Sequence, residues 1–477
     1  MPIRRLIRNA TIISVDPAIG TLPRADILIE GERILAVGPD LGVGDADVID
    51  GVGRIALPGL IDAHRHLWMT LLRGTVSDGT WSSYLVETFW GRRNLFTAED
   101  HHAATLAGCC EALEAGVTTL LDFHDASTAP GAADACIDAL EESGIRAVFA
   151  YGLEGAPELP AGRPAGVVDL CPSQSWHRDE ATALRRGRLA GDDRRITMGI
   201  TVRNLDRLPW SCTEEDLGLA RALGVRTTTT HAGLGALSGG ASWIDGLARH
   251  GLLGPDLLFS HGQSFSGDEL DLLASAGVKI VVSAESEMGQ GGDPVTWKAL
   301  QHGVTVAIGA DSVGSVSGDL FRHMQITLKA ARGSRNRLLD AQGIAPTDVA
   351  TTAADMLEIA TMGGARALRM EDRTGSLTPG KQADVILLAR DRIGMNSGAS
   401  PEQVAVLQAN GADVETVLVA GCPRKRDGRL VGVDTAALGA RLDRARERMD
   451  AAYEPAAIAP IWTAYRNMVA AGGEADN

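Results

Sequence analysis

The chain has 477 residues, which is too many for one ordinary domain but fits a large barrel with a smaller second domain. Its formal net charge of −16 argues against a nucleic acid or an anionic membrane surface as a partner. The six cysteines include no Cys-x-x-Cys pair, so neither a disulfide framework nor a thiolate zinc site is expected. The sequence shows no apolar signal core and no stretch long enough to span a bilayer, so we expect a reduced, cytoplasmic location.

Residues 3–56 alternate short apolar runs with glycine-rich turns and show no helical period. They predict strands at Leu6–Ile13, Ala25–Glu30, Arg33–Val37, Asp47–Ile49 and Arg54–Leu57. Runs of the same kind return near the other end of the chain, at Ala383–Ala389, Val414–Val419 and Arg429–Val433. Because each group is too small to be stable alone, we expect residues 1–56 and 373–433 to form one composite β-sandwich domain.

Between these groups, over residues 57–372, the sequence repeats the order strand, loop and helix. Eight near-continuous apolar runs are typical of a parallel sheet that is covered on both faces. The predicted fold class is therefore α/β, a (β/α)8 TIM barrel, with an open doubly wound sheet as the alternative. Residues 434–477 contain a charged amphipathic helix near Ala436–Ala452 and are expected to be a C-terminal helical extension.

Ligand-type side chains stand where the predicted barrel strands end. The first strand ends in His64-x-His66, and alternate strand residues share a face, so both imidazoles should point the same way. Three later strands end in His231, His261 and Asp311. Because barrel active sites are built at the carboxyl ends of the strands, we expect these five side chains to meet. Four imidazoles and a carboxylate suit one divalent metal ion, Zn2+ before Fe2+.

Such an ion would lower the pKa of a bound water and give hydroxide as a nucleophile at neutral pH. Asp311 would then accept that proton and pass it to the leaving group. The alternative for Asp311 is a carboxylate that only caps the next helix.

The motifs resemble the amidohydrolase superfamily, in its cytosine deaminase and triazine hydrolase (chlorohydrolase-like) branch. Three blocks are similar to its first, second and eighth strand motifs: Pro58-Gly-Leu-Ile-Asp-Ala-His64-Arg-His66, Gly116-Val-Thr-Thr119 and Gly309-Ala-Asp311-Ser312. The resemblance covers the chain from about Ile7 to Val433. It implies that His64, His66, His231 and Asp311 bind the metal, and that His261 completes the shell or polarises the substrate. It also implies a homodimer. No strand-4 lysine occurs in residues 196–202, so a carbamylated-lysine binuclear site is not expected.

One departure from the family pattern affects the chemistry. Deaminases of this branch carry a glutamate three residues after the strand-5 histidine as a proton shuttle, and this chain has Leu234 there. Glu285 and Glu287 follow the seventh strand and are the nearest candidates to serve as the proton shuttle instead. If that strand continues they should share a face. The alternative is that they cap a helix or pair with arginines.

Aromatic residues cluster after the first strand, although only 4% of the chain is aromatic. They are Trp68, Trp81, Tyr84 and Trp90, with Met69 among them. Flat rings beside a metal suit a planar heterocycle, although the loop could simply pack on the barrel rim. The residues predicted to contact substrate are Trp68, Trp81, His124 and Arg203.

The sequence therefore predicts a metal-dependent hydrolase. It would cleave a carbon–nitrogen bond, of deamination or amide/amidine type, or a carbon–chlorine bond of a small nitrogen heterocycle. Its predicted catalytic residues are Asp311, His261, Glu285 and Glu287. Leu234 leaves a changed reaction open, such as that of a lyase, isomerase or cyclase. A non-catalytic ligand-binding protein on the same scaffold is the remaining alternative.

Overall fold

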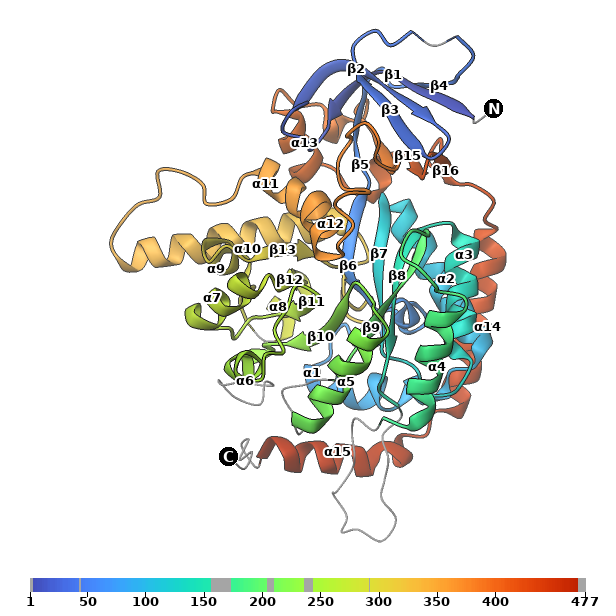
Figure 1. The fold of residues 1–477 in the computed structure, drawn as a ribbon, viewed down its shortest axis with the longest axis vertical. Helices are drawn as coiled ribbons and strands as arrows, with labels where there is room; N and C mark the ends of the chain where they lie inside the picture. Colours follow the sequence, from blue (N-terminus) through green and yellow to red (C-terminus); the bar gives the residue numbers. More distant parts are fainter. Residues whose placement is uncertain are drawn as a thin grey trace.

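The computed structural model describes residues 3–42, 44–155, 173–203, 210–235, 243–290 and 292–470. Figure 1 shows a sheet built from both ends of the chain at one end of the molecule, with a barrel of parallel strands next to it. Within the described segments, no helix combines the length and apolar character that a bilayer crossing requires.

The terminal sheet is mixed and has nine strands in the order β17-β16-β15-β14-β5-β1-β2-β3, with β4 beside β1. Its N-terminal strands are β1 (Arg4–Ile13), β2 (Thr21–Glu30), β3 (Arg33–Gly38), β4 (Asp47–Asp50) and β5 (Arg54–Pro58). Its C-terminal strands are β14 (Val385–Ala389), β15 (Val414–Val419), β16 (Cys422–Arg426) and β17 (Arg429–Leu430). The two groups join where β5 pairs antiparallel with β14. Both chain ends thus share one sheet, as the sequence predicted.

The second sheet has eight parallel strands in chain order from β6 to β13. They are β6 (Leu60–Arg65), β7 (Val117–His124), β8 (Arg146–Gly152), β9 (Ile196–Thr201), β10 (Thr228–Ala232), β11 (Leu257–His261), β12 (Lys279–Val282) and β13 (Thr305–Ile308). A bridge between Arg65 and Asp311 closes the ring, since Asp311 N donates to His64 O at 2.9 Å and His66 N donates to Asp311 O at 3.2 Å. The predicted barrel is confirmed, and the open sheet is excluded.

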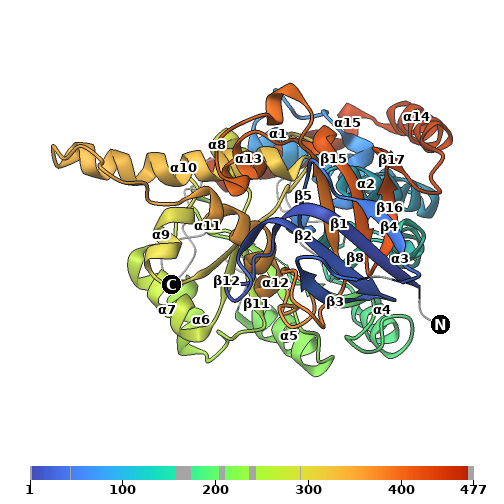
Figure 2. The same ribbon diagram turned by 90° about the horizontal axis from the view of Figure 1, so that it is seen from above.

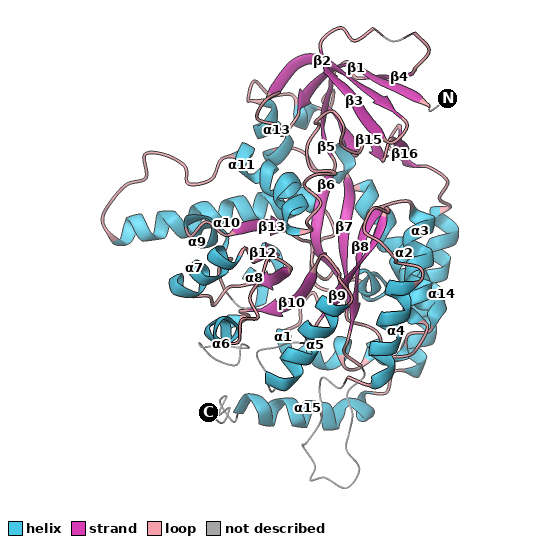
Figure 3. Ribbon diagram, viewed as in Figure 1, coloured by secondary structure: helices cyan, strands magenta, loops and turns pink. Residues whose placement is uncertain are grey.

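Helices surround this barrel, as Figures 2 and 3 show, because the strands bury apolar side chains on both faces. The helices are α2 (Ala98–Glu114), α3 (Ala132–Ser143), α4 (Ser175–Arg186), α5 (Trp210–Ala222), α6 (Trp243–Arg249), α7 (Gly267–Ala276), α8 (Ala284–Gln290), α9 (Thr296–Gln301) and α10 (Leu320–Ala341). Three more, α11 (Ala353–Glu358), α12 (Gly364–Ala367) and α13 (Pro401–Leu407), lie between the barrel and the terminal sheet (Figure 1). Side chains of α12 pack inside the barrel with Ile61, Leu121 and Phe123.

The apolar run that leads to the first histidines is divided between the two sheets. Strand β5 ends at Pro58 and β6 begins at Leu60, so Leu57 and Pro58 pair with β14 in the terminal sheet. Gly59 N donates to Asp384 O at 3.0 Å at this junction. A Cβ atom on Gly59 would overlap the side chain of Thr118, so only glycine fits there.

The C-terminal residues form α14 (Thr435–Ala452) and α15 (Pro455–Ala470). Helix α14 lies beside α2, and α15 crosses the end of the barrel opposite the terminal sheet (Figure 1). Both pack on the aromatic segment after β6, which contains α1 (Trp81–Ser83) and a π-helical turn at Tyr84–Phe89. Ser82 Oγ donates to the hydroxyl of Tyr465 at 3.1 Å. The helical extension therefore supports the segment that borders the barrel mouth.

Candidate metal centre

The five residues predicted to bind a metal lie together at the carboxyl ends of the barrel strands. The ring centroid of His64 lies 4.9 Å from that of His66, 5.2 Å from that of His231 and 5.5 Å from that of His261. Asp311 Oδ1 lies 3.3 Å from His64 Nε2 and 3.4 Å from His66 Nε2. All are buried except His231, which is partly buried. We call this group the barrel-mouth centre.

The backbone holds two of these residues in an unusual conformation. His261 has φ of 83° and Asp311 has φ of 63°, in the left-handed region that side chains with a Cβ seldom adopt. Such strain persists only where the surroundings impose it, and it is common at functional sites. The backbone at Gly309 also lies close to the backbone of His64, because a Cβ on Gly309 would lie 2.6 Å from His64 O.

Three imidazoles are oriented by partners on their Nδ1 atoms. The pairs are His64 Nδ1 with Ser260 Oγ at 3.0 Å, His66 Nδ1 with Asp125 Oδ1 at 3.0 Å, and His261 Nδ1 with Glu287 Oε1 at 3.2 Å. This arrangement leaves the Nε2 atoms of the same three residues buried and without a hydrogen-bond partner in the described part of the chain. Metal-binding histidines are commonly oriented in this way, by a second group on the other ring nitrogen.

The donor set fits a divalent metal. Ligand atoms of His64, His231 and His261 lie within 4.8 Å of one another, as do those of His64, His66 and Asp311. Buried polar atoms without partners are unfavourable, and an ion bound among these nitrogens would satisfy them. Imidazole nitrogen and carboxylate oxygen are the ligands that Zn2+ and Fe2+ accept in catalytic sites.

Burial and neighbouring charges set the protonation of the centre. Burial lowers the pKa of His64 to about 4 and moves the pKa of His231 well below its usual value, so both rings are neutral near pH 7. Burial also opposes the charge on His66, but Asp125 and Asp311 outweigh it and raise the pKa of His66 to about 10. Although burial favours the neutral acid, His64 and His66 hold the pKa of Asp311 well below its usual range. Asp311 is therefore a carboxylate that can accept a proton.

The two glutamates after the seventh strand do not share a face. Strand β12 ends at Val282 and α8 begins at Ala284, so the side chains of Glu285 and Glu287 diverge by about 200° around a helix. Glu287 is buried, accepts from Ser283 N at 2.8 Å and contacts His261. Glu285 pairs with Arg322 on α10, which the sequence left open as the alternative role. Only Glu287 reaches the centre, and it does so through His261.

Two of the four predicted substrate residues are tryptophans of the segment after β6. Trp68 is fully buried and donates from Nε1 to Asp125 Oδ1 at 2.8 Å. Trp81 is partly buried and stacks on Tyr84 with centroids 5.0 Å apart. Its position beside the mouth keeps it a candidate for substrate contact.

The other two predicted substrate residues are held away from open solvent. His124 is buried on the outer side of the barrel wall, where its Nδ1 lies 3.8 Å from Cys136 Sγ. Arg203 makes a two-point ion pair with Asp216, with Nε and Nη2 donating at 2.8 and 2.9 Å. Leu234 follows β10 and is partly buried, whereas Asn204, which follows Arg203, lies outside the described residues.

Sequence reasoning did not assign the residues that orient the imidazoles. Asp125 accepts from both His66 and Trp68, and Ser260 contacts His64. Their sequence signal was only positional, because Asp125 directly follows β7 and Ser260 directly precedes His261. Tyr84 is buried nearby, and burial raises the pKa of its phenol well above the usual value, an effect to which Asp125 and Asp311 add.

Comparison with known proteins agrees with this geometry. Residues 55–431 match the model of the amidohydrolase family. The chain is 31% identical over 443 residues to a 5'-deoxyadenosine deaminase of Methanothermobacter thermautotrophicus, covering 88% of this chain and 95% of that protein. It is also 31% identical over 457 residues to a 5-methylthioadenosine/S-adenosylhomocysteine deaminase of Desulforudis audaxviator, covering 94% and 99%.

Solved structures show the same fold. The atrazine chlorohydrolase of Arthrobacter aurescens TC1 in complex with zinc aligns with a TM-score of 0.80 at 25% identity, covering 93% of this chain and 100% of that one. An adenosine deaminase from Xanthomonas campestris with bound zinc aligns with a TM-score of 0.80 at 23% identity, covering 94% and 99%. Neither a changed reaction nor a non-catalytic binding role is favoured by these relatives.

The centre, the barrel and the relatives agree with the enzyme class expected from the sequence. That class is a metal-dependent hydrolase that acts on carbon–nitrogen bonds other than peptide bonds. With the family model matching residues 55–431, the chain belongs to the amidohydrolase family.

Proposed function

We propose that this protein removes an exocyclic amino group from a small planar nitrogen heterocycle by hydrolysis. The observation that carries the proposal is the convergence of His64, His66, His231, His261 and Asp311 at one barrel mouth. Relatives at 31% identity are named as deaminases of adenine-containing compounds, which favours deamination over the removal of chloride. An amino-substituted purine nucleoside is therefore the first substrate class to test.

The centre would hold one divalent ion, zinc before iron, with His64, His66, His231 and Asp311 as its ligands and His261 facing it. When bound, such an ion acts as a Lewis acid and lowers the pKa of water toward neutrality. Asp311 is a carboxylate near pH 7 and lies at the strand end, so it can accept a proton and return it to the leaving amine. The partly buried His231 lies on the most exposed side of the centre, where a substrate would approach.

His261 and Glu287 form the unit that we assign to the function of the missing strand-5 glutamate. Glu287 holds Nδ1 of His261, which aims Nε2 at the centre. His261 can then donate to or accept from a ring atom of the substrate, and Leu234 has no proton to offer. Glu287 acts through His261 and is a positioning residue. Glu285, paired with Arg322, has no part in the proposed reaction.

Metal analysis and a substrate screen test the proposal together. The enzyme reconstituted with zinc is incubated with adenine nucleosides, cytosine, aminotriazines and chlorotriazines, and ammonia and chloride release are measured. We expect bound zinc and ammonia release from at least one amino heterocycle. In Asp311→Asn the turnover should fall by about 10²–10⁴-fold while the protein stays folded. Absence of bound metal after reconstitution contradicts the proposal, and chloride release without ammonia replaces deamination with dechlorination.

The homodimer and the cytoplasmic location remain predictions. Light scattering coupled to size-exclusion chromatography gives the mass of the assembly in solution, and a mass of one chain contradicts the dimer. Fractionation of the source cells tests the location.

A further inference from the structure

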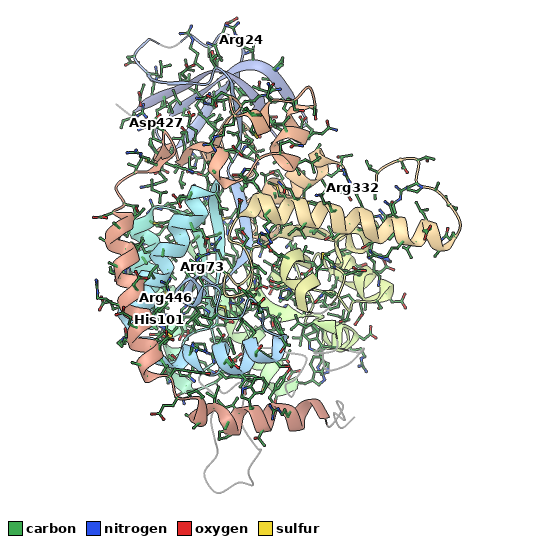
Figure 4. The ribbon with its side chains drawn as sticks, turned by 180° about the vertical axis from the view of Figure 1, so that it is seen from behind. Arg24, Arg73, His101, Arg332, Asp427 and Arg446 are labelled. Carbon is green, nitrogen blue, oxygen red and sulfur yellow. The ribbon has the colours of Figure 1, made fainter. Side chains whose placement is uncertain are left out.

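A second group of ligand-type side chains lies on the other side of the barrel wall. Alternate residues of β7 face opposite sides of the sheet. The ring of Phe123 faces the barrel-mouth centre, with its centroid 4.9 Å from that of His64 and 4.3 Å from that of His231. His124, the next residue, faces the helices, where it meets His101 of α2 and Cys136 of α3. Figure 4 labels His101 in this helical layer. We call His101, His124 and Cys136 the outer cluster.

The outer cluster has the dimensions of a metal site. One ligand atom from each of the three residues lies within 4.8 Å of the others. His124 Nδ1 lies 3.8 Å from Cys136 Sγ. The Zn–N and Zn–S bond lengths put nitrogen and sulfur ligands of a tetrahedral zinc about 3.5 Å apart. A contraction of a few tenths of an ångström at this pair would bring both onto one ion.

The ring nitrogens of the cluster lack partners. Both nitrogens of His101 and Nε2 of His124 are buried and make no hydrogen bond within the described residues. His124 and Cys136 have no exposed surface, and His101 has 1%. Three unpartnered nitrogens beside one thiol are unfavourable in a packed core, because water cannot reach them. An ion bound between them removes that penalty.

Burial keeps the two imidazoles of the outer cluster in their metal-binding form. Burial lowers the pKa of His101 to about 4 and the pKa of His124 to about 3, so both rings are neutral. Burial, and after it the nearby Asp122, raise the pKa of the Cys136 thiol well above its usual value, so the bound ion itself has to displace that proton. Asp125 lies close to His124. Arg93 is the opposing charge nearby, and its guanidinium donates to the backbone oxygens of Asp125 and Gly155. The carboxylate of Asp125 therefore offsets the charge of Arg93.

We propose that His101, His124 and Cys136 bind a second transition-metal ion, of the zinc class, that ties β7 to α2 and α3. Two imidazoles and one thiolate suit a borderline-soft cation. On binding, the Cys136 S–H bond breaks, a sulfur–metal bond forms and one proton passes to water. The imidazoles donate lone pairs, and no electron is transferred. Sequence patterns do not predict this site, because its ligands come from three separate elements and include a single cysteine.

Cobalt substitution tests the proposal by spectroscopy, independently of catalysis. The full-length protein is stripped of metal, reconstituted with Co2+ and examined for cobalt content and near-ultraviolet absorption. A thiolate bound to Co2+ gives a sulfur-to-metal charge-transfer band, and the ligand-type groups of the barrel-mouth centre are histidine and carboxylate. We expect two cobalt ions per chain and this band. One cobalt ion per chain without the band overturns the proposal.

Variants assign the band to the outer cluster. Cys136→Ala should lose the band and one cobalt ion and keep the ion at the barrel mouth. Cys110→Ala is the matched control, since Cys110 is a buried cysteine on α2 outside the cluster, and it should keep both ions and the band. If Cys136→Ala does not fold, His101→Leu and the unmodified protein still decide the question. A band that persists in Cys136→Ala or His101→Leu overturns the assignment.

The two metal sites can fail independently. In Asp311→Asn, the sulfur-to-cobalt band should remain even if the barrel-mouth ion is lost. Removal of the outer ion should lower the thermal midpoint of unfolding, because a ligand that binds only the folded state stabilises it.

Discussion

Each of three imidazoles at the barrel mouth is held by a different neighbour, and the neighbours differ in charge. Ser260 offers a neutral hydroxyl to His64, whereas Asp125 and Glu287 offer carboxyl groups to His66 and His261. A carboxylate raises the basicity of the imidazole that it contacts and fixes its tautomer. We therefore expect the partners of His66 and His261 to affect function more than Ser260, the partner of His64, does.

The variant Glu287→Gln tests how much the partner of His261 affects function. The sequence analysis predicted Glu287 as one of the catalytic residues. The amide keeps the size of the side chain but weakens its hold on His261, so kcat/KM should fall by about 10–100-fold. The metal content should stay the same, because Glu287 contacts His261 and Ser283 and none of the four proposed ligands. Steady-state kinetics on the best substrate and metal analysis measure the two effects.

Glu285→Gln is the matched control, because it lies two residues away on α8 and pairs with Arg322. Its kcat/KM should stay within about twofold of the original, because Glu285 contacts Arg322 and no residue of the barrel-mouth centre. Equal losses in both variants would show that α8 as a whole, and not the contact with His261, sets the activity.

The metal-free protein should lose stability as pH rises. The pKa of His66 is raised to about 10 in the folded state, against about 6.5 when unfolded, through Asp125 and Asp311. A raised pKa contributes stability that is complete below pH 6.5 and is lost as pH rises through about 10. Thermal midpoints of chelator-treated protein between these pH values measure the loss.

Asp125→Asn serves as the comparison for that titration. The variant removes one of the two carboxylates that raise the pKa of His66, so its midpoint should fall less steeply with pH. Equal slopes in both proteins would contradict the assignment of this stability to the pair of His66 and Asp125.

At the scale of single elements, apolar patterns located strands well and their ends less well. Glu285 and Glu287 were expected to share a face if the seventh strand continued, but β12 ends at Val282 and α8 begins at Ala284. The sequence could not show this, because an apolar run indicates where a strand lies and not at which residue it gives way to a helix. The pattern also did not show that residues 54–65 are divided between the two sheets. Side chains are buried on both sides of the junction, so the apolar run continues across it. The histidines of the barrel-mouth centre were still predicted correctly as a group, because they lie at the carboxyl ends of the strands and an error at the start of a strand does not move them.

Gly59→Ala tests the junction between β5 and β6. The added Cβ would overlap Thr118, so the strands must shift, and overpacking of this kind costs about 1–3 kcal/mol. Urea unfolding followed by circular dichroism measures the change in the free energy of unfolding. Gly38→Ala in the terminal sheet is the control, because no atom lies within 4 Å of the position that its Cβ would take, and its change should stay within about 0.5 kcal/mol.

For the whole molecule, the sequence predicted the union of the two chain ends because neither group of strands could bury a core alone. The side-chain contacts that join the sheet to the barrel were not predictable, since their partners are far apart in the chain. Arg146, at the start of β8, donates from Nε to Asp384 Oδ2 at 2.8 Å and from Nη2 to Oδ1 at 3.2 Å. Both side chains are almost fully buried, with exposures of 1% and 0%.

This buried pair should bear on stability without affecting chemistry. Asp384 also accepts from Ala420 N at 2.7 Å and from Thr374 Oγ1 at 3.1 Å, so it organises the turn that leads into β14. The pair lies where β8 begins, and the metal residues lie where the strands end. A substitution here should therefore lower the free energy of unfolding and leave kcat of the folded enzyme unchanged.

Arg146→Met should lower that free energy by about 3–5 kcal/mol, because it leaves the Asp384 carboxylate buried without its cation. Breaking the pair of partly exposed Arg335 and exposed Asp348 with Arg335→Met should cost less than about 1 kcal/mol, since water reaches both charges. Urea unfolding measures both, and initial rates below the unfolding transition check the kcat of each variant. A small loss in Arg146→Met would mean that water or a rearranged Thr374 replaces the guanidinium, and the sheet would then be held to the barrel by its apolar contacts alone.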